Sequence, residues 1–100
     1  SALSYDPVWS PNNQWIAFVS TKSGNDEIWI MDTEGQNQQQ LTFNSWEWDK
    51  HPTWSPDGSQ VAFYSNRTGK RQIFIMNPDG SNQVNISNNQ YDDWNPVWIK

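Results

Sequence analysis

The chain has 100 residues and a mass of 11.7 kDa, which fits one small domain, and only 34% of its residues are hydrophobic. Eight tryptophans argue against a disordered segment, and the net charge of −5 disfavours nucleic acid as a partner. The absence of cysteine excludes a disulfide framework, and the apolar runs are too short for a membrane-spanning helix.

The sequence contains one unit twice, with a shift of 45 residues. Pro-Val-Trp-Ser-Pro at 7–11 aligns with Pro-Thr-Trp-Ser-Pro at 52–56, and the match continues as far as the Asn-Gln pair that begins at Asn37 and again at Asn82. A third start, Asn-Pro-Val-Trp, begins at Asn95. We therefore place repeat one at residues 5–46, repeat two at residues 50–91 and the start of a third repeat at residues 92–100.

Each unit has four short runs rich in Ile, Val, Phe and Trp, separated by Gly, Pro, Asn and Asp, and neither unit shows a helical pattern. Strands are expected in unit one at 7–10, 15–20, 27–31 and 38–42, and in unit two at 52–55, 60–65, 72–76 and 83–87. A ninth strand is expected in 92–100. A period near 45 with four short strands is typical of a propeller blade, so we predict an all-β fold of two four-stranded antiparallel blades.

Four segments of unit two resemble a known family. They are Pro-Thr-Trp-Ser-Pro-Asp-Gly at 52–58, Val-Ala-Phe-Tyr-Ser at 61–65, Arg-Thr-Gly at 67–69 and Ile-Phe-Ile-Met-Asn-Pro-Asp-Gly at 73–80. The succession resembles the WD-repeat-like blade of TolB-type β-propellers. This resemblance implies a periplasmic or secreted protein-binding module that needs no cofactor. Similar blades also occur as non-catalytic domains of serine peptidases and in some lyases.

Two blades leave two apolar sheet faces uncovered, because propeller blades pack face to face around a channel. Covering each face is worth on the order of 10 kcal/mol, so we expect a homo-oligomer that closes head to tail. Since similar rings are most often six-bladed, a trimer is the first choice and a tetramer the second. The residues expected in the blade core are Trp9, Trp54, Trp98, Phe18 and Phe63.

Strand direction places the connections between units at one end of the blades, together with the loops between the second and third strands. We call this end the top face. Binding residues are expected there, since loops on a rigid scaffold commonly carry function. The candidates are Trp46, Trp48, Asp49, His51, Arg67 and Trp94. They suit a peptide or protein ligand, or alternatively a glycan stacked on the loop tryptophans.

Other chemistry has weaker support in the sequence. Asp6, His51 and Asn95 occupy equivalent positions, so symmetry could gather them as metal ligands, but we expect them to form hydrogen bonds to neighbouring loop backbone instead. No Gly-x-Ser-x-Gly elbow accompanies the serines, and adjacent loop acids are usually solvated, so no enzyme is predicted. A propeller-assembly fragment without a ligand of its own remains an alternative.

Overall fold

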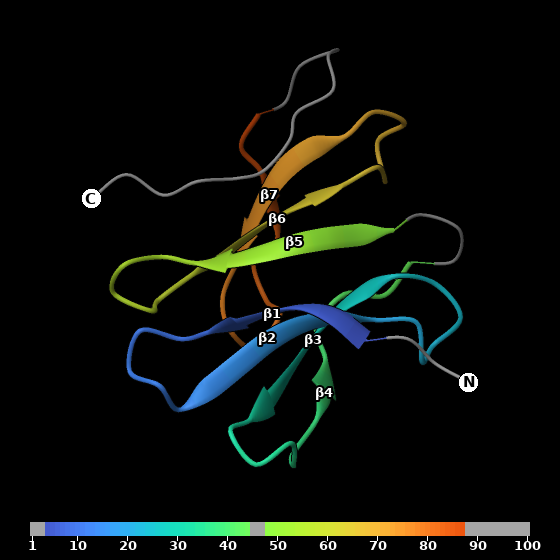
Figure 1. Cartoon of the computed structure of the whole chain (residues 1–100). Coiled ribbons are helices and arrows are strands. Elements are labelled where there is room, and N and C mark those ends of the chain that lie inside the picture. Colours follow the sequence, from blue (N-terminus) through green and yellow to red (C-terminus); the bar gives the residue numbers. More distant parts are fainter. Residues whose placement is uncertain (1–3, 45–47, 88–100) are drawn as a thin grey trace.

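The computed structural model describes residues 4–44 and 48–87, which form two antiparallel four-stranded sheets (Figure 1). The strands of the first sheet are β1 (Ser4–Trp9), β2 (Trp15–Ser20), β3 (Glu27–Asp32) and β4 (Gln39–Gln40). Those of the second are β5 (Asp49–Trp54), β6 (Val61–Ser65), β7 (Gln72–Met76) and β8 (Val84–Asn85). Within each sheet the strands follow chain order, which confirms the all-β prediction of two four-stranded blades. The expected ninth strand lies outside the described residues.

The 45-residue repeat extends to the backbone. Every positive φ in unit one has a counterpart 45 residues later: Asp6 and His51, Asn13 and Gly58, Gly24 and Gly69, Gly35 and Gly80, Asn37 and Asn82. The first strand of each unit also changes register against the second at the same place, between Tyr5 and Val8 and between Lys50 and Thr53. The two units therefore share one set of turns and one bulge.

The first and last strands of each unit differ in length from the prediction. β1 and β5 begin three residues earlier than expected, because pairing resumes beyond the bulge that accommodates Pro7 or Pro52, which have no N–H to donate. β4 and β8 have two residues each instead of five, because only two residues of each pair with the preceding strand. The first strands of both units lie side by side at the centre of Figure 1, where β5 contacts β1, β2 and β3.

The hydrophobic core lies between the two sheets, and we call this interface the inner seam. It is formed by Ala17, Val19, Ile28, Ile30 and Leu41 of unit one and by Trp54, Val61, Phe63, Phe74 and Met76 of unit two. The core is thus shared between the units, as expected for blades that pack face to face.

The aromatic side chains expected in the core differ in their exposure to solvent. Trp54 is 7% exposed, and its indole Nε1 donates to the carbonyl of Val8 at 3.0 Å. Trp9, its equivalent, is 53% exposed, because no second blade within residues 4–44 and 48–87 lies against that side of β1, and its packing against a neighbouring chain stays a prediction. Phe18 and Phe63 are buried, at 4% and 0% exposure. Trp98 lies outside the described residues.

Across residues 4–44 and 48–87 there is no helix with the length and apolar character that a membrane crossing requires.

Candidate functional site at the top of the inner seam

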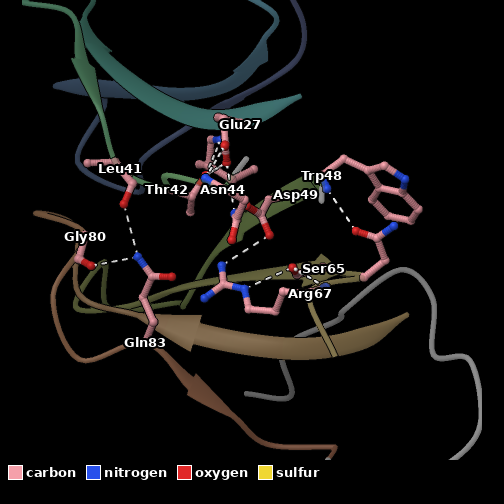
Figure 2. A network of polar contacts seen from close by, with 12 residues as sticks. Glu27, Leu41, Thr42, Asn44, Trp48, Asp49, Ser65, Arg67, Gly80 and Gln83 are labelled. Carbon is pink, nitrogen blue, oxygen red and sulfur yellow. Dashed lines mark hydrogen bonds and ion pairs between the residues drawn. The ribbon is translucent and has the colours of Figure 1, made fainter. Parts of the chain in front are cut away.

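Two buried carboxyl groups lie together at the top of the inner seam, one from each unit (Figure 2). Glu27 at the start of β3 is 1% exposed, and Asp49 at the start of β5 is 0% exposed. Asn44 links them, because its side-chain amide donates to both carboxyl groups. Its backbone N–H also donates to Glu27 Oε2 at 2.6 Å. The chain that leads from unit one to unit two is therefore tied to both blades.

Burial determines the protonation of Glu27. Burial first, and then the hydrogen bond with the Asp49 carboxyl group, raise the pKa of Glu27 from 4.5 to about 7. The hydroxyl of Thr42, which donates to Glu27 Oε1 at 2.6 Å, and the backbone N–H of Asn44 act in the opposite direction. The buried Glu27 carboxyl group therefore holds its proton to a higher pH than an exposed glutamate does.

Arg67 balances the charge of Asp49 from the loop between β6 and β7. Its Nη2 lies 3.2 Å from Asp49 Oδ1, and its Nε donates to Ser65 Oγ at 3.0 Å. The guanidinium also lies over the Phe74 ring, 4.4 Å from the ring centroid. This cation–π contact and the ion pair fix the loop against the seam.

A second group of polar side chains lies beside the seam, around β1 and β5. His51 Nδ1 is 3.2 Å from Asp6 Oδ2, and the imidazole stacks on Tyr64 with 5.0 Å between ring centroids. Lys50 Nζ lies 3.6 Å from Asp26 Oδ2 and 5.0 Å from the centre of the Trp48 ring. The charged side chains of this group and His51 are partly exposed, unlike the acids of the seam.

The backbone at Asp6 and His51 is held in an uncommon conformation. Their φ angles are 53° and 54°, in the left-handed region that non-glycine residues rarely adopt. Both residues belong to the bulges of β1 and β5, which turn the two side chains toward each other. Strain of this kind persists only where the surrounding structure enforces it, and it often accompanies functional sites.

Comparison with known proteins identifies the family. The family model described as TolB beta propeller domain matches residues 1–100, the whole chain. The chain belongs to the TolB β-propeller domain family.

Named TolB proteins are among its relatives. The Tol-Pal system protein TolB of Geobacter sulfurreducens is 66% identical over 29 residues, which are 29% of this chain and 7% of that protein. The solved putative TolB from Agrobacterium tumefaciens has a TM-score of 0.84 and 32% identity over 94% of this chain and 34% of its own. TolB from Acinetobacter baumannii has a TM-score of 0.70 and 26% identity, over 81% of this chain and 20% of its own. The chain therefore spans about a third or less of each relative.

The TolB-type blades bring some of the predicted site residues together. Asp49 and Arg67 form an ion pair, but Asp49 is buried and is therefore part of the seam rather than of an open binding surface. Trp48 packs edge-on against Tyr64, with its backbone N–H held by Asn66 Oδ1 at 2.8 Å. Trp46, Trp94 and Asn95 lie outside the described residues.

The weak metal candidates form a pair with each other. Asp6 and His51 are ion-paired, and among residues 4–44 and 48–87 no cluster of three or more His, Asp or Glu side chains is arranged to hold a metal ion. The observed contact joins the two side chains, whereas the sequence led us to expect hydrogen bonds to neighbouring loop backbone, a role that stays a prediction.

The sequence interpretation missed Glu27, Thr42 and Asn44. The repeat contains a signal for the first two, because Glu27 aligns with Gln72 and Thr42 with Ser87. The structure repeats their contacts: the Ile28 N–H donates to Thr42 Oγ1 at 2.9 Å, and the Ile73 N–H donates to Ser87 Oγ at 2.8 Å. A polar residue that occurs at the same position next to an apolar strand in both units indicates a buried hydrogen bond.

Proposed function

We propose that this chain is a non-enzymatic TolB-type binding scaffold that associates with copies of itself into a closed ring. Three two-bladed chains are our first choice and four the second. The observation that carries the proposal is the contrast between Trp54, buried at 7% exposure in the inner seam, and Trp9, 53% exposed at the same position of the repeat. An apolar blade face of this kind is stabilised by another blade.

The proposed ligand is an extended segment of a peptide or protein. Its binding surface is the part of the top face that lies at the starts of β1 and β5. Trp48, Lys50, His51 and Asp6 provide an aromatic ring, a cation and a partly exposed ion pair there. Their mutual contacts hold them in place before a ligand arrives, which lowers the entropic cost of binding. The burial of Glu27 and Asp49 supports a non-catalytic role for that acid pair, because a substrate would not reach either carboxyl group.

We propose a periplasmic location for this chain, which its similarity to TolB proteins supports. Fractionation of cells that produce the natural protein tests this location. Recovery with cytoplasmic markers would contradict it.

Titration of the protein with a set of unstructured peptides, followed by fluorescence anisotropy, tests the ligand site. For a peptide that binds, Trp48→Ala is expected to weaken binding by tenfold or more, because an aromatic anchor is being removed. Trp15→Ala is the matched control. Trp15 is a partly exposed tryptophan at the start of β2, at the end of the blade away from the top face. Equal binding by the parent protein and by Trp48→Ala would move the site off the top face.

A further inference from the structure

The inner seam has polar contacts as well as apolar ones, and the residues of unit two that make them have counterparts in unit one. Trp54 Nε1 donates to the Val8 carbonyl, and Gln83 Nε2 donates to the Leu41 carbonyl, both at 3.0 Å. Gly80 lies so close to Leu41 that a Cβ there would be 2.8 Å from the Leu41 carbonyl oxygen. Unit two thus contributes the donors and the close glycine, and unit one contributes the two carbonyl groups.

The same elements are present on the two outward faces, where no second blade lies against them within residues 4–44 and 48–87. Forty-five residues earlier, Trp54, Gln83 and Gly80 correspond to Trp9, Gln38 and Gly35. Trp9 and Gln38 are exposed, and a Cβ on Gly35 would meet nothing within 4 Å.

On the outward face of unit two, Leu41 corresponds to Ile86 and Val8 to Thr53. Leu41 is 4% exposed, whereas Ile86 is 55% exposed.

Gln38 is already oriented for the contact that Gln83 makes. Gln83 Nε2 donates to the carbonyl of its own turn glycine, Gly80, at 2.9 Å as well as to Leu41. Gln38 Nε2 donates in the same way to Gly35 at 3.0 Å. The amide therefore needs no reorganisation to meet a second carbonyl group.

We infer that the outward face of unit one binds the outward face of unit two in a second copy of this chain, through contacts that repeat the inner seam. The Trp9 indole would donate to the carbonyl of Thr53 of the partner subunit, and the Gln38 amide to the carbonyl of Ile86 of the partner subunit. This outer seam rests on the proposed self-association and specifies which surfaces make it.

The arrangement of donors also sets the direction of assembly. Both seam donors, Trp9 and Gln38, lie on unit one, and both acceptor carbonyls, of Thr53 and Ile86, lie on unit two. Two unit-one faces would therefore place donors opposite donors. The contact is head to tail, the kind that closes into a ring rather than a two-fold dimer.

The two seams differ in their polar ends, so the outer seam is not a copy in every respect. The inner seam joins Glu27 to Asp49 and Arg67. At the outer seam the equivalent positions are Gln72 of one copy and Ser4 and Lys22 of the other. Gln72 is 1% exposed and accepts from Ser87 Oγ at 3.1 Å, which satisfies it without a carboxyl neighbour. The outer seam therefore brings no two buried acids together.

Cross-linking of two single-cysteine variants tests the outer seam, because the chain has no cysteine of its own. Gln38→Cys and Ile86→Cys are purified separately, mixed, allowed to exchange subunits, and treated with a short bifunctional thiol reagent. We expect covalent dimers in the mixture at tenfold or more the yield from either variant alone. The Leu41→Cys, Gln83→Cys double variant is the matched control, since Gln83 contacts the Leu41 backbone across the inner seam and the two cysteines should cross-link within one chain.

Sedimentation equilibrium of the same samples separates the two possible failures. A folded monomer without intermolecular cross-links would overturn both self-association and the outer seam. A discrete oligomer that cross-links Ile86→Cys chains to one another, or does not cross-link at all while the control does, would overturn only the outer seam. Both substituted residues are exposed, and circular dichroism checks that each variant keeps its β structure.

Discussion

The covered and open faces of the two blades carry the same pattern of residues and differ in what lies against them. Trp54 and Leu41, in the inner seam, are 7% and 4% exposed, whereas their counterparts Trp9 and Ile86 are 53% and 55% exposed. The strands, turns and bulge around each pair are equivalent. Burial of these side chains therefore depends on a neighbouring blade rather than on the fold of their own unit.

Truncation of the seam tryptophans is expected to have the largest effect. Trp54→Ala should lower the free energy of unfolding by about 3–5 kcal/mol, because it leaves a cavity in the core and removes the hydrogen bond from the indole to the Val8 carbonyl. Trp9→Ala should leave the fold of the chain intact and lower the oligomer mass instead. Thermal unfolding and sedimentation measure the two outcomes. Equal loss of stability in both variants would show that the two faces are not different in the single chain.

Glu27→Gln is expected to remove a pH dependence from the inner seam. Because the pKa of Glu27 is raised from 4.5 to about 7 in the folded chain, its contribution to stability is complete below pH 4.5 and is lost as the pH rises through 7. The loss is on the order of 3 kcal/mol.

Glutamine, the residue that unit two has at position 72, should flatten this part of the curve and make the protein more stable at pH 8. Urea unfolding between pH 4.5 and pH 8 measures it, with the exposed Glu34→Gln as control. A parent curve and a Glu27→Gln curve of the same shape would contradict the assignment.

Alanine at the two equivalent turn glycines separates backbone strain from contact across a seam. Gly35 and Gly80 have φ angles of +80° and +87°, so each substitution should cost about 1 kcal/mol in strain. Gly80→Ala should cost about 1–3 kcal/mol more, since its Cβ would approach the Leu41 backbone, which has to move. Chemical unfolding of both variants at low protein concentration measures the difference. Identical values would mean that the contact at Gly80 is easily relieved.

The smallest expected effect is that of the seam glutamines. Gln83→Ala should lower the free energy of unfolding by about 1 kcal/mol, because it removes a hydrogen bond to the Leu41 carbonyl. Gln38→Ala should change the unfolding of the chain little and weaken only its association. Calorimetry in dilute and concentrated solution distinguishes the two. If Gln38→Ala changed neither quantity, Gln38 would have no part in the outer seam.

The sequence predicted the blades well because their signals are local and occur twice. The 45-residue shift, the apolar runs and the Gly and Asn turn positions placed β2 and β7 at their observed bounds. The first strands were predicted too short, because Pro7 and Pro52 suggested a strand start, whereas the chain passes each proline through a bulge. The last strand of each unit was predicted too long, because a two-residue pairing leaves no sequence signal that differs from a longer one.

The candidate site was predicted less well because its contacts join residues far apart in the chain. Asp49 and Arg67 were identified as top-face candidates, but their pairing depends on how the loop after β6 folds back on β5. Glu27 looked like an ordinary charged residue at the start of a strand, and only the packing of the two sheets buries it beside Asp49. The exposure of Trp9 depends on a neighbouring blade, which the local pattern of one unit does not specify.

The most direct test of the central claim, that the open blade faces are seams, is sedimentation equilibrium of the parent chain beside Trp9→Ala at micromolar concentration. The parent is expected as one discrete species near three times the 11.7 kDa chain mass, or four times it for a tetramer. Trp9→Ala is expected to shift toward the mass of one chain while keeping its β structure by circular dichroism. A folded parent chain that sediments at 11.7 kDa would contradict the account.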